Sequence, residues 1–393
     1  MRTVAGLMAS WLVKCHVGIS GTSNRNLICR SWNRLMAKTA QIRLRRAPSP
    51  GERDLTSCRV NHVWRPDRRL LIPSAKAGNK ILFAMLDELP ISSRGHEFDV
   101  AIVGGGPAGL AAGMYLARFL HSVIVVDAGD ARAKLIPKSH NCPGFPDGVG
   151  GSELLGRLKA QAQRYGAGVV DGRVAGGKKR DGTFVLTTTF GTIRARRVVL
   201  ATGIVDKAPA IEGLEEAVAA GTVRLCPVCD AYEAVGKRIG VVGPEHLALK
   251  EALFLKEYSG QVTLLANYPE DISDAARGMA SAGGIEIWDT VEDLVARATG
   301  FGVVMADGAP MRELDVVYPA MGSDVRSELA IALGAECDAQ GYVLVSRHLE
   351  TSTAGLYAIG DVAEGLNQIA VAFGHAATAA THIHNALQSR PES

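Results

Sequence analysis

The sequence predicts an α/β fold, because strand-like and helix-like segments alternate from about residue 98 to the C-terminus. In two places a short apolar strand runs into a glycine turn and then into a helix, at 100–118 and at 239–258. The composition agrees, since the chain has 44 glycines and 5% aromatic residues, as expected of many tight turns between strands and helices. With 393 residues, 47% of them hydrophobic, the chain is long enough for two medium domains.

The charge is spread unevenly along the chain. The net charge is +3, yet residues 1–95 hold 17 Lys and Arg against 5 Asp and Glu, which leaves 26 against 35 for the remainder. The globular part is therefore acidic, and we expect no nucleic-acid partner. No apolar run approaches the length of a membrane span, so we expect no membrane partner either.

Residues 1–96 are predicted to be a basic extension, either disordered or not part of the native protein. The segment is rich in Arg, has no sustained periodicity, and is followed from Met85 by a normally composed region. A secretory signal is disfavoured, because Lys14 and Cys15 follow the apolar stretch 3–13 where a small-residue cleavage site belongs. A basic organellar transit peptide is the remaining alternative.

The first glycine turn follows a predicted strand at Val100–Val103. Gly104, Gly106 and Gly109 form a G-x-G-x-x-G pattern, and Asp127 ends the next strand 18 residues later. The first glycine makes the turn, the second lets the backbone approach a pyrophosphate, and the third lets helix and strand pack closely. Asp127 is placed to accept a hydrogen bond from a ribose hydroxyl. This segment therefore predicts a dinucleotide-binding site.

Two further segments resemble parts of the same site. Residues 182–203 read as a hairpin and a strand that ends in Ala201-Thr202-Gly203. A strand at Gly355–Ile359 ends in Gly360-Asp361 and precedes a long Ala-rich helix. A helix N-terminus beside a redox ring can stabilise the negative charge that develops on reduction.

Cys226-Pro-Val-Cys229 is the one C-x-x-C among seven cysteines. Such a pair can cycle between dithiol and disulfide, and the attacking species is the thiolate. A structural zinc site needs four ligands and no second pair exists, so we expect no metal. An odd number of irregularly spaced cysteines favours a reducing compartment, and we expect a cytoplasmic protein.

Together these motifs resemble the low-molecular-weight thioredoxin reductases of the flavoprotein disulfide reductase family, over residues 97–388. "VAIVGGGPAGLAAGMYLAR" is similar to the family's first FAD motif, and "YAIGDVAEGLNQIAVA" to its second. "NCPGFP" is similar to its Asn-x-Pro-Gly-Phe-Pro segment, and "LCPVCDAYE" to its redox-active cysteine motif.

The resemblance implies two Rossmann-like domains, each a three-layer (ββα) unit, with the second inserted into the first. Residues 97–206 and 322–388 would form the FAD-binding domain, and 207–321 the inserted NAD(P)-like domain that carries the cysteines. A homodimer is the typical assembly of the family. The implied FAD-binding residues are Gly104, Gly106, Pro107, Ala108, Gly109, Asp127, Asn141, Ala201, Thr202, Gly203, Gly360, Asp361, Gln368 and Ile369.

The resemblance also implies catalytic roles. Cys226 and Cys229 would exchange electrons with FAD and with a thioredoxin-like protein or a small disulfide or dithiol. Asp230 would donate or accept a proton, as its counterpart in the family does. His375 is either an acid or base near the flavin or the cysteines, or an ordinary histidine on a helix face. The residues do not decide which cysteine faces the flavin.

The second glycine turn departs from the family pattern. The expected G-x-G-x-x-A reads Gly243-Pro244-Glu245-His246-Leu247-Ala248, so that Glu245 directs a carboxylate toward the phosphate position and Pro244 lacks an N–H donor. After the next strand, Ala266, Asn267 and Tyr268 stand where the family's NADPH enzymes have His-Arg-Arg. We therefore expect NADPH and NADH to be poor electron donors.

Three functions follow from these motifs. The first is a thioredoxin reductase-like disulfide oxidoreductase, fed by a ferredoxin or another reduced carrier if NAD(P)H does not serve. The second is a dithiol oxidase, in which substrate thiols reduce the cysteine pair and oxygen is the final acceptor. The third, a flavin redox sensor without turnover, is disfavoured by the intact C-x-x-C-Asp sequence.

Overall fold

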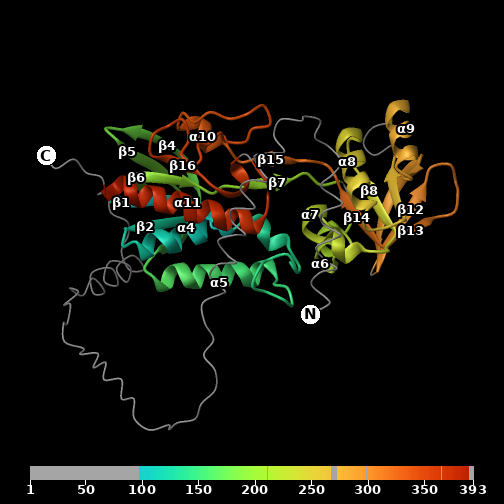
Figure 1. The fold of residues 1–393 in the computed structure, drawn as a ribbon, viewed down its shortest axis with the longest axis horizontal. Coiled ribbons are helices and arrows are strands. Elements are labelled where there is room, and N and C mark those ends of the chain that lie inside the picture. The colour runs from blue at the N-terminus through green and yellow to red at the C-terminus, as the bar shows by residue number, and fades with distance from the viewer. Residues whose placement is uncertain (1–96, 210, 267–271, 298, 364, 389–393) are drawn as a thin grey trace, which may run out of the picture. The chain divides into compact units, whose positions relative to one another are not determined.

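A computed structural model describes residues 97–388 apart from 210, 267–271, 298 and 364 (Figure 1). The extension predicted for residues 1–96 thus lies outside the described residues. None of the described helices combines the length and the apolar character that crossing a membrane requires.

The first sheet has seven strands in the order β3-β2-β1-β6-β5-β4, and β16 pairs with the end of β6. β1, β2, β3, β6 and β16 run parallel, whereas β4 and β5 are antiparallel to their neighbours. The sequences FDVAIV and VIVVD form the central strands because near-continuous apolar runs suit strands covered on both faces. The strands are β1 (Glu97–Val103), β2 (Val123–Asp127), β3 (Gly168–Asp171), β4 (Val174–Arg180), β5 (Thr183–Thr188), β6 (Gly191–Leu200) and β16 (Leu356–Ala358).

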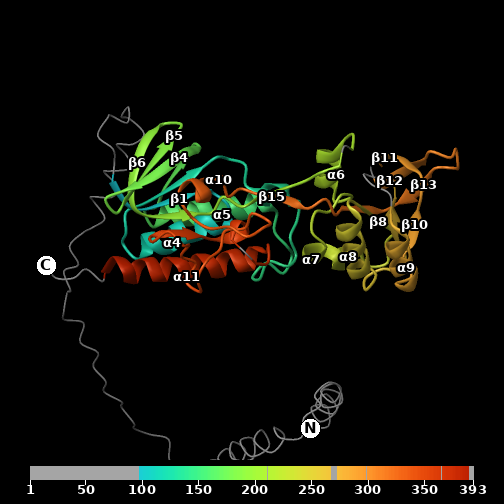
Figure 2. The ribbon, with the colours of Figure 1, turned by 90° about the horizontal axis from the view of Figure 1, so that it is seen from above.

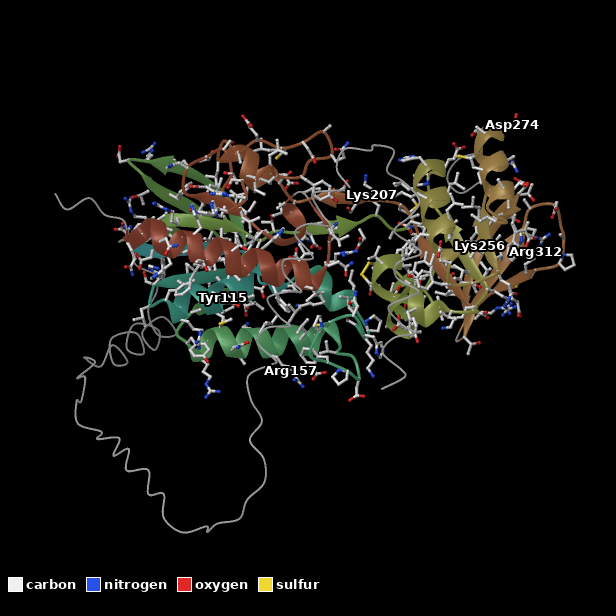
Figure 3. All side chains as sticks on the ribbon, viewed as in Figure 1. Tyr115, Arg157, Lys207, Lys256, Asp274 and Arg312 are labelled. Carbon is white, nitrogen blue, oxygen red and sulfur yellow. A yellow bond between two sulfur atoms is a disulfide. The ribbon has the colours of Figure 1, made fainter. Side chains whose placement is uncertain are left out.

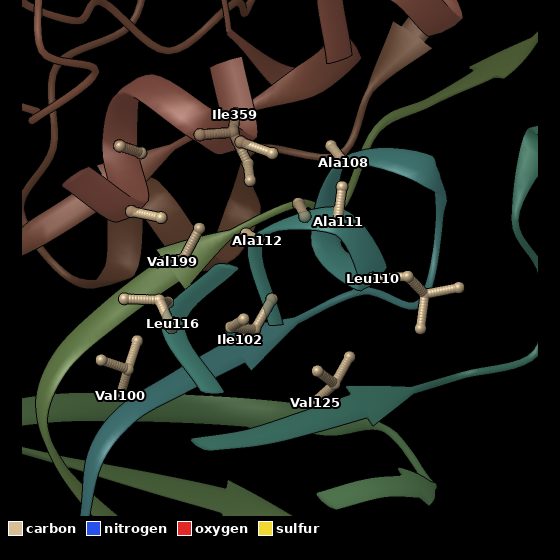
Figure 4. Close-up of a cluster of buried hydrophobic side chains, with 14 of the residues drawn as sticks. Val100, Ile102, Ala108, Leu110, Ala111, Ala112, Leu116, Val125, Val199 and Ile359 are labelled. Carbon is tan, nitrogen blue, oxygen red and sulfur yellow. The ribbon is translucent and has the colours of Figure 1, made fainter. Parts of the chain in front are cut away.

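This sheet is the middle of three layers. Helices α4 (Pro107–Arg118), α5 (Gly151–Arg164) and α11 (Ile369–Gln388) cover one face. The β4–β5 hairpin and α10 (Glu328–Ala332) lie toward the other face, as Figure 1 shows. In Figure 4, side chains of β1, β2 and β6 meet those of α4 in the core on the helical side.

The packing of α11 on α4 depends on small residues. Ala372, Ala376, Ala379 and Ala380 of α11 are buried in the same cluster as Ala108, Ala111 and Ala112 of α4. Small side chains let two helix backbones approach closely, and alanine loses no rotamer freedom on burial. Segments more than 250 residues apart in the sequence therefore form one tightly packed helix pair.

A second parallel sheet has the order β10-β9-β8-β14 and also lies between two layers. Helices α8 and α9 pack on one face, and α6 with the antiparallel strands β11, β12 and β13 covers the other (Figure 2). The bounds are α6 (Leu214–Ala220), β8 (Ile239–Val242), α8 (Glu245–Leu255), β9 (Val262–Leu265), α9 (Asp274–Ala282), β10 (Glu286–Trp288), β11 (Val291–Arg297), β12 (Gly300–Met305), β13 (Arg312–Leu314) and β14 (Val316–Pro319).

The chain crosses between the two sheets twice, through β7 (Ile204–Asp206) and β15 (Ser323–Val325). These two short strands pair antiparallel with each other, and the Lys207 ammonium lies 3.0 Å from Asp324 Oδ1. The second sheet is thus inserted between β6 and β16 of the first. The predicted α/β class, with two Rossmann-like units of which one is inserted, is confirmed.

The turn before α4 offers a direct test of this packing. A Cβ on Gly109 would lie 2.0 Å from the Gly104 carbonyl oxygen. We expect Gly109→Ala to lower the free energy of unfolding by about 1–3 kcal/mol, because neither backbone segment can move without disturbing β1. Urea unfolding followed by circular dichroism measures the change.

Gly156 on α5 is the matched control, since a Cβ there meets no atom within 4 Å. Gly156→Ala should stabilise the protein by about 0.5–1 kcal/mol, as alanine does at exposed helical sites. Equal stability of the two variants would contradict the close approach of Gly109 to Gly104.

Candidate functional site

A cavity of about 1050 Å³ opens at the carboxyl ends of the parallel strands of the first sheet. Residues that follow β1, β2 and β6 line it, together with η3 (Gly360–Val362) and the start of α11. Ligands of open α/β sheets bind at this edge. The predicted site residues that line the cavity are Gly104, Gly106, Pro107, Ala108, Asp127, Asn141, Ala201, Thr202, Gly203, Cys226, Cys229, Asp230, Gly360, Asp361, Gln368 and Ile369.

The turn after β1 is shaped by close approach of two backbone segments. Gly104 has a φ of +115°, and a Cβ there would lie 2.2 Å from the Ala201 carbonyl oxygen. Gly106 is the N-cap of α4, and a Cβ on it would meet no atom within 4 Å. The N-terminus of α4 is therefore open to the cavity, where its free N–H groups can bind an anion.

Asp127 lies at the end of β2 beside this turn. Its Oδ1 accepts a hydrogen bond from the Gly129 N–H at 2.9 Å. A Cβ on Gly105 would lie 2.2 Å from the carboxyl carbon of Asp127, so the turn passes close to this side chain. The carboxylate is held where an acidic residue can accept a hydrogen bond from a ribose hydroxyl.

A half-buried arginine joins one of the two crossings, β7, to η3 at the cavity. Arg132, on η1 (Arg132–Leu135), donates to both carboxylate oxygens of Asp206 at 2.6 and 2.9 Å. Its Nη1 also lies 3.7 Å from Asp361 Oδ2. Burial raises the pKa of Asp361, whereas the Arg132 charge lowers it. Arg132 thereby offsets part of the negative charge of two half-buried carboxylates.

The predicted cysteine pair forms a disulfide at the wall of the cavity. Cys226 is the N-cap of the short helix α7 (Pro227–Asp230) and is bonded to Cys229, as the yellow bond beside α7 in Figure 3 shows. The Gln368 amide Nε2 lies 3.3 Å from Cys229 Sγ and 3.6 Å from Cys226 Sγ. Asn141 Nδ2 in turn donates to Gln368 Oε1 at 2.9 Å. Residues of the second FAD-like motif, of the Asn-x-Pro-Gly-Phe-Pro segment and of the disulfide therefore meet in one place.

Asp230 is held by two side chains that the sequence analysis did not identify. Arg224 Nη1 lies 3.2 Å from Asp230 Oδ2, and the Tyr318 hydroxyl donates to Asp230 Oδ1 at 3.0 Å. Burial raises the pKa of Asp230, while these two partners lower it. Arg224 could have been noticed as a lone charge in the apolar run before the cysteines. Tyr318 carries no comparable signal, because it ends an ordinary buried strand.

His375 and Gly109 are the two predicted site residues outside the cavity lining. His375 Nδ1 accepts a hydrogen bond from the Gly360 N–H at 3.2 Å. Burial lowers the pKa of His375, which favours the neutral ring that this hydrogen bond requires. The structure thus places the His375 ring against the backbone of η3 and outside the cavity lining.

The cavity fits a dinucleotide such as the FAD that the resemblance implies. The open N-terminus of α4 suits a pyrophosphate, and Asp127 suits a ribose. Asn367 Oδ1 is a buried acceptor without a hydrogen-bond partner among the described residues, and Asn367 lines the cavity. The cationic side chains in the lining are Arg132, Lys138, Arg173, Arg224 and Arg326, and each of the four arginines is paired with a carboxylate.

The second glycine turn keeps the fold but has different chemistry. Gly243 has a φ of +154°, and a Cβ on it would lie 2.3 Å from the Ala320 carbonyl oxygen, just as Gly104 approaches Ala201 in the first turn. Pro244 is the N-cap of α8, and the Glu245 carboxylate accepts the Ser273 N–H at 2.6 Å. Hydrogen bonds from Ser273 lower the pKa of Glu245, so this side chain is an anion at the start of α8.

Within the described part of the chain, no group of three or more His, Cys, Asp or Glu side chains is arranged to hold a metal ion. Cys142 is buried and free, and burial raises the pKa of its thiol. The sulfur chemistry of the described cavity is therefore that of Cys226 and Cys229.

Similarity to known proteins agrees with this geometry. The sequence profile described as pyridine nucleotide-disulphide oxidoreductase matches residues 98–376. A thioredoxin reductase of Treponema pallidum is 31% identical over 297 residues, which cover 72% of this chain and 95% of that protein. The solved oxidoreductase from Agrobacterium tumefaciens is 29% identical, with a TM-score of 0.65 over 74% of this chain and 99% of that one. Giardia duodenalis thioredoxin reductase is 27% identical, with the same TM-score and coverage.

The Arg132 pairing predicts a pH-dependent loss of stability. We expect Arg132→Met to lower the free energy of unfolding by about 1–3 kcal/mol near neutral pH, because the half-buried Asp206 and Asp361 lose their cation. Without Arg132 the pKa of Asp361 rises further above its unfolded value, so stability is retained at low pH and lost as the pH rises through the folded pKa.

The loss should therefore shrink at about pH 5, and urea unfolding at both pH values measures it. Arg157→Met is the control, since the exposed pair of Arg157 with Glu153 should contribute at most about 1 kcal/mol. A loss for Arg132→Met that does not change with pH would contradict the pairing.

Proposed function

This chain belongs to the pyridine nucleotide-disulphide oxidoreductase family, and on that premise we propose that it passes electrons between bound FAD and the Cys226–Cys229 pair. The enzyme is a thioredoxin reductase-like disulfide oxidoreductase. One observation carries the proposal: the disulfide is in the wall of the dinucleotide-sized cavity, in contact with Gln368. We assign the FAD-binding domain to 97–206 and 322–388, and the inserted domain to 207–321.

FAD would be held by the residues that shape the cavity. The N-terminus of α4, from Gly106, would bind the pyrophosphate, and Asp127 would bind a ribose. Asp361, Asn141 and Gln368 would contact the more distant part of the cofactor. When bound, FAD supplies a two-electron carrier.

The cysteine pair would exchange with its substrate through a mixed disulfide. Reduction of the pair leaves thiolates that need protons, and Asp230 is placed within α7 to supply them. Burial keeps the pKa of Asp230 above its ordinary value, which favours a carboxyl group that can donate a proton. Arg224 and Tyr318 would position this carboxyl group.

The second glycine turn bears on the identity of the physiological electron donor. The Glu245 anion and the missing N–H of Pro244 both weaken phosphate binding at the second turn. A ferredoxin-type carrier would then reduce the enzyme, with a thioredoxin-like protein or a small disulfide as the electron acceptor. The same turn favours a second candidate, a dithiol oxidase in which substrate thiols supply the electrons and oxygen accepts them. Under either candidate we propose a cytoplasmic homodimer.

The cysteine assignment has a direct test. We expect Cys226→Ser and Cys229→Ser each to abolish disulfide turnover, because exchange needs both sulfurs, while FAD remains bound. Turnover of the purified protein with dithiothreitol or reduced methyl viologen as donor measures the first effect, and flavin absorbance of the folded protein measures the second. Cys337→Ser is the matched control, since Cys337 lies outside the cavity lining and should leave turnover unchanged. Full activity in both pair variants would refute the proposal.

The second turn predicts which donor bleaches the flavin. In anaerobic titrations we expect NADPH and NADH to reduce the flavin slowly, and Glu245→Gly to raise the apparent affinity for either by about tenfold or more. Rapid stoichiometric reduction of the unaltered protein by NADPH would show that the second site is functional. Bleaching by a dithiol alone, with peroxide formed when air is admitted, would favour the oxidase, and bleaching by reduced ferredoxin alone would favour the reductase.

A further inference from the structure

The Cys226–Cys229 disulfide borders a second, smaller cavity of about 370 Å³, here called the outer pocket. Cys229 lines both the outer pocket and the large cavity. Of these two cavities, Cys226 lines only the large one. The outer pocket is lined by His140, Asn141, Pro227, Val228, Cys229, Asp230, Ala231, Tyr232, Glu233 and Tyr258. The two cavities therefore share one part of their lining, made of His140, Asn141, Cys229, Asp230 and Glu233.

The walls of the outer pocket combine polar side chains with two tyrosines and the exposed Val228. Tyr232 follows α7 on η2 (Ala231–Ala234), and its side chain is 79% exposed although it is aromatic. Val228, within the C-x-x-C itself, is 54% exposed. Tyr258 supplies a second ring from the turn after α8. Exposed aromatic and aliphatic groups around a cavity indicate a binding surface, because such side chains are normally covered.

The charge of the outer pocket is negative. Asp230 and Glu233 line it, and its lining has neither lysine nor arginine among the described residues. Glu233 Oε2 is buried without a hydrogen-bond partner among the described residues. An anionic ligand would be repelled here, whereas a neutral ligand or one with a donor or cationic group would be accepted.

We propose that the outer pocket binds a small neutral or cationic disulfide or dithiol with an aromatic group, and that Cys229 is the sulfur that exchanges with it. The volume falls within the roughly 300–1000 Å³ of small-molecule sites. The two tyrosine rings would stack on the aromatic group, and the carboxylates would exclude anions. This inference rests on the redox role proposed above for the cysteine pair and names the class of its substrate.

The exchange is balanced without a further reagent. A substrate thiolate attacks Cys229 Sγ, a bond forms between the two sulfurs, and Cys226 leaves as a thiolate. The second substrate thiolate then attacks the substrate sulfur of this mixed disulfide and releases Cys229. The substrate loses two electrons and two protons and becomes a disulfide, and the cysteine pair gains the same two electrons and binds two protons. The reverse sequence reduces a substrate disulfide.

The experiment follows mixed-disulfide formation on the full-length, FAD-loaded Cys226→Ser variant, in which Cys229 is a free thiol. Three probes are compared: dithiodipyridine, which is neutral and aromatic; hydroxyethyl disulfide, which is neutral and aliphatic; and dithiobis(nitrobenzoate), which is aromatic and anionic. Each rate is divided by the rate of the same probe with free cysteine. A variant that lacks both Cys226 and Cys229 gives the background from the other cysteines. Flavin turnover is not needed for this measurement.

We expect dithiodipyridine to have the highest normalised rate. Tyr232→Ala and Tyr258→Ala should each lower that rate by about three- to tenfold while leaving hydroxyethyl disulfide unchanged. Glu233→Gln should raise the rate of the anionic probe by at least about threefold. Tyr165→Ala is the matched control, because Tyr165 is also an exposed tyrosine and lies outside both cavities. Cys226, tested in the Cys229→Ser variant, should not respond to the tyrosine substitutions.

The opposite outcomes separate this inference from the proposed function. If Cys229 reacts with all three probes regardless of the tyrosines, the outer pocket proposal is wrong and the redox role of the pair stands. If Cys229 reacts with no probe, both are wrong. If the tyrosine variants slow exchange with a thioredoxin-like protein but not with the small probes, the surface docks a protein and the small-molecule proposal is wrong.

Discussion

The close approach of the Gly104 turn to the end of β6 is the constraint on which the functional site depends. No side chain fits between Gly104 and the Ala201 carbonyl, so the turn lies directly over the edge of the sheet. That position aims the first N–H groups of α4 into the cavity, next to Asp127 and the residues after β6. The same edge of the sheet receives η3 and Gln368 from the other end of the chain. These walls of the cavity are therefore positioned relative to the contact between Gly104 and Ala201.

The two glycine turns show that fold and chemistry make separate demands on one motif. Gly243 approaches Ala320 as Gly104 approaches Ala201, and a strand and a helix follow the same path in both cases. The same close approach positions the turn of the second Rossmann-like unit. Phosphate binding needs more, because it depends on the N–H groups and charges at the next two positions, where Pro244 and Glu245 stand. A domain can thus retain its architecture when the residues next to the first glycine of its turn depart from the family pattern.

Sequence patterns were sufficient for the parts of the site that are local. Apolar runs identify β1 and β8, glycine spacing identifies the turns, and the C-x-x-C pair is visible at once. Contacts between residues far apart in the sequence could not be predicted from local patterns. Tyr318 is 88 residues from Asp230, and Arg132 is 74 residues from Asp206. The sequence is compatible with His375 as an acid or base near the flavin or the cysteines, and equally with an ordinary histidine on a helix face. Helical periodicity does not reveal that its ring turns toward the Gly360 backbone.

The alanine-rich contact between α11 and α4 has a mechanical consequence. Alanine side chains have no rotatable bonds that could absorb a shift of one helix backbone relative to the other. We therefore expect α4 and α11 to move together. The glycine turn precedes α4, and Gln368, which contacts the two sulfurs, precedes α11 at the same end of this helix pair. Thermal motion would then displace the glycine turn and Gln368 together, so the distance between these two walls of the cavity would vary little.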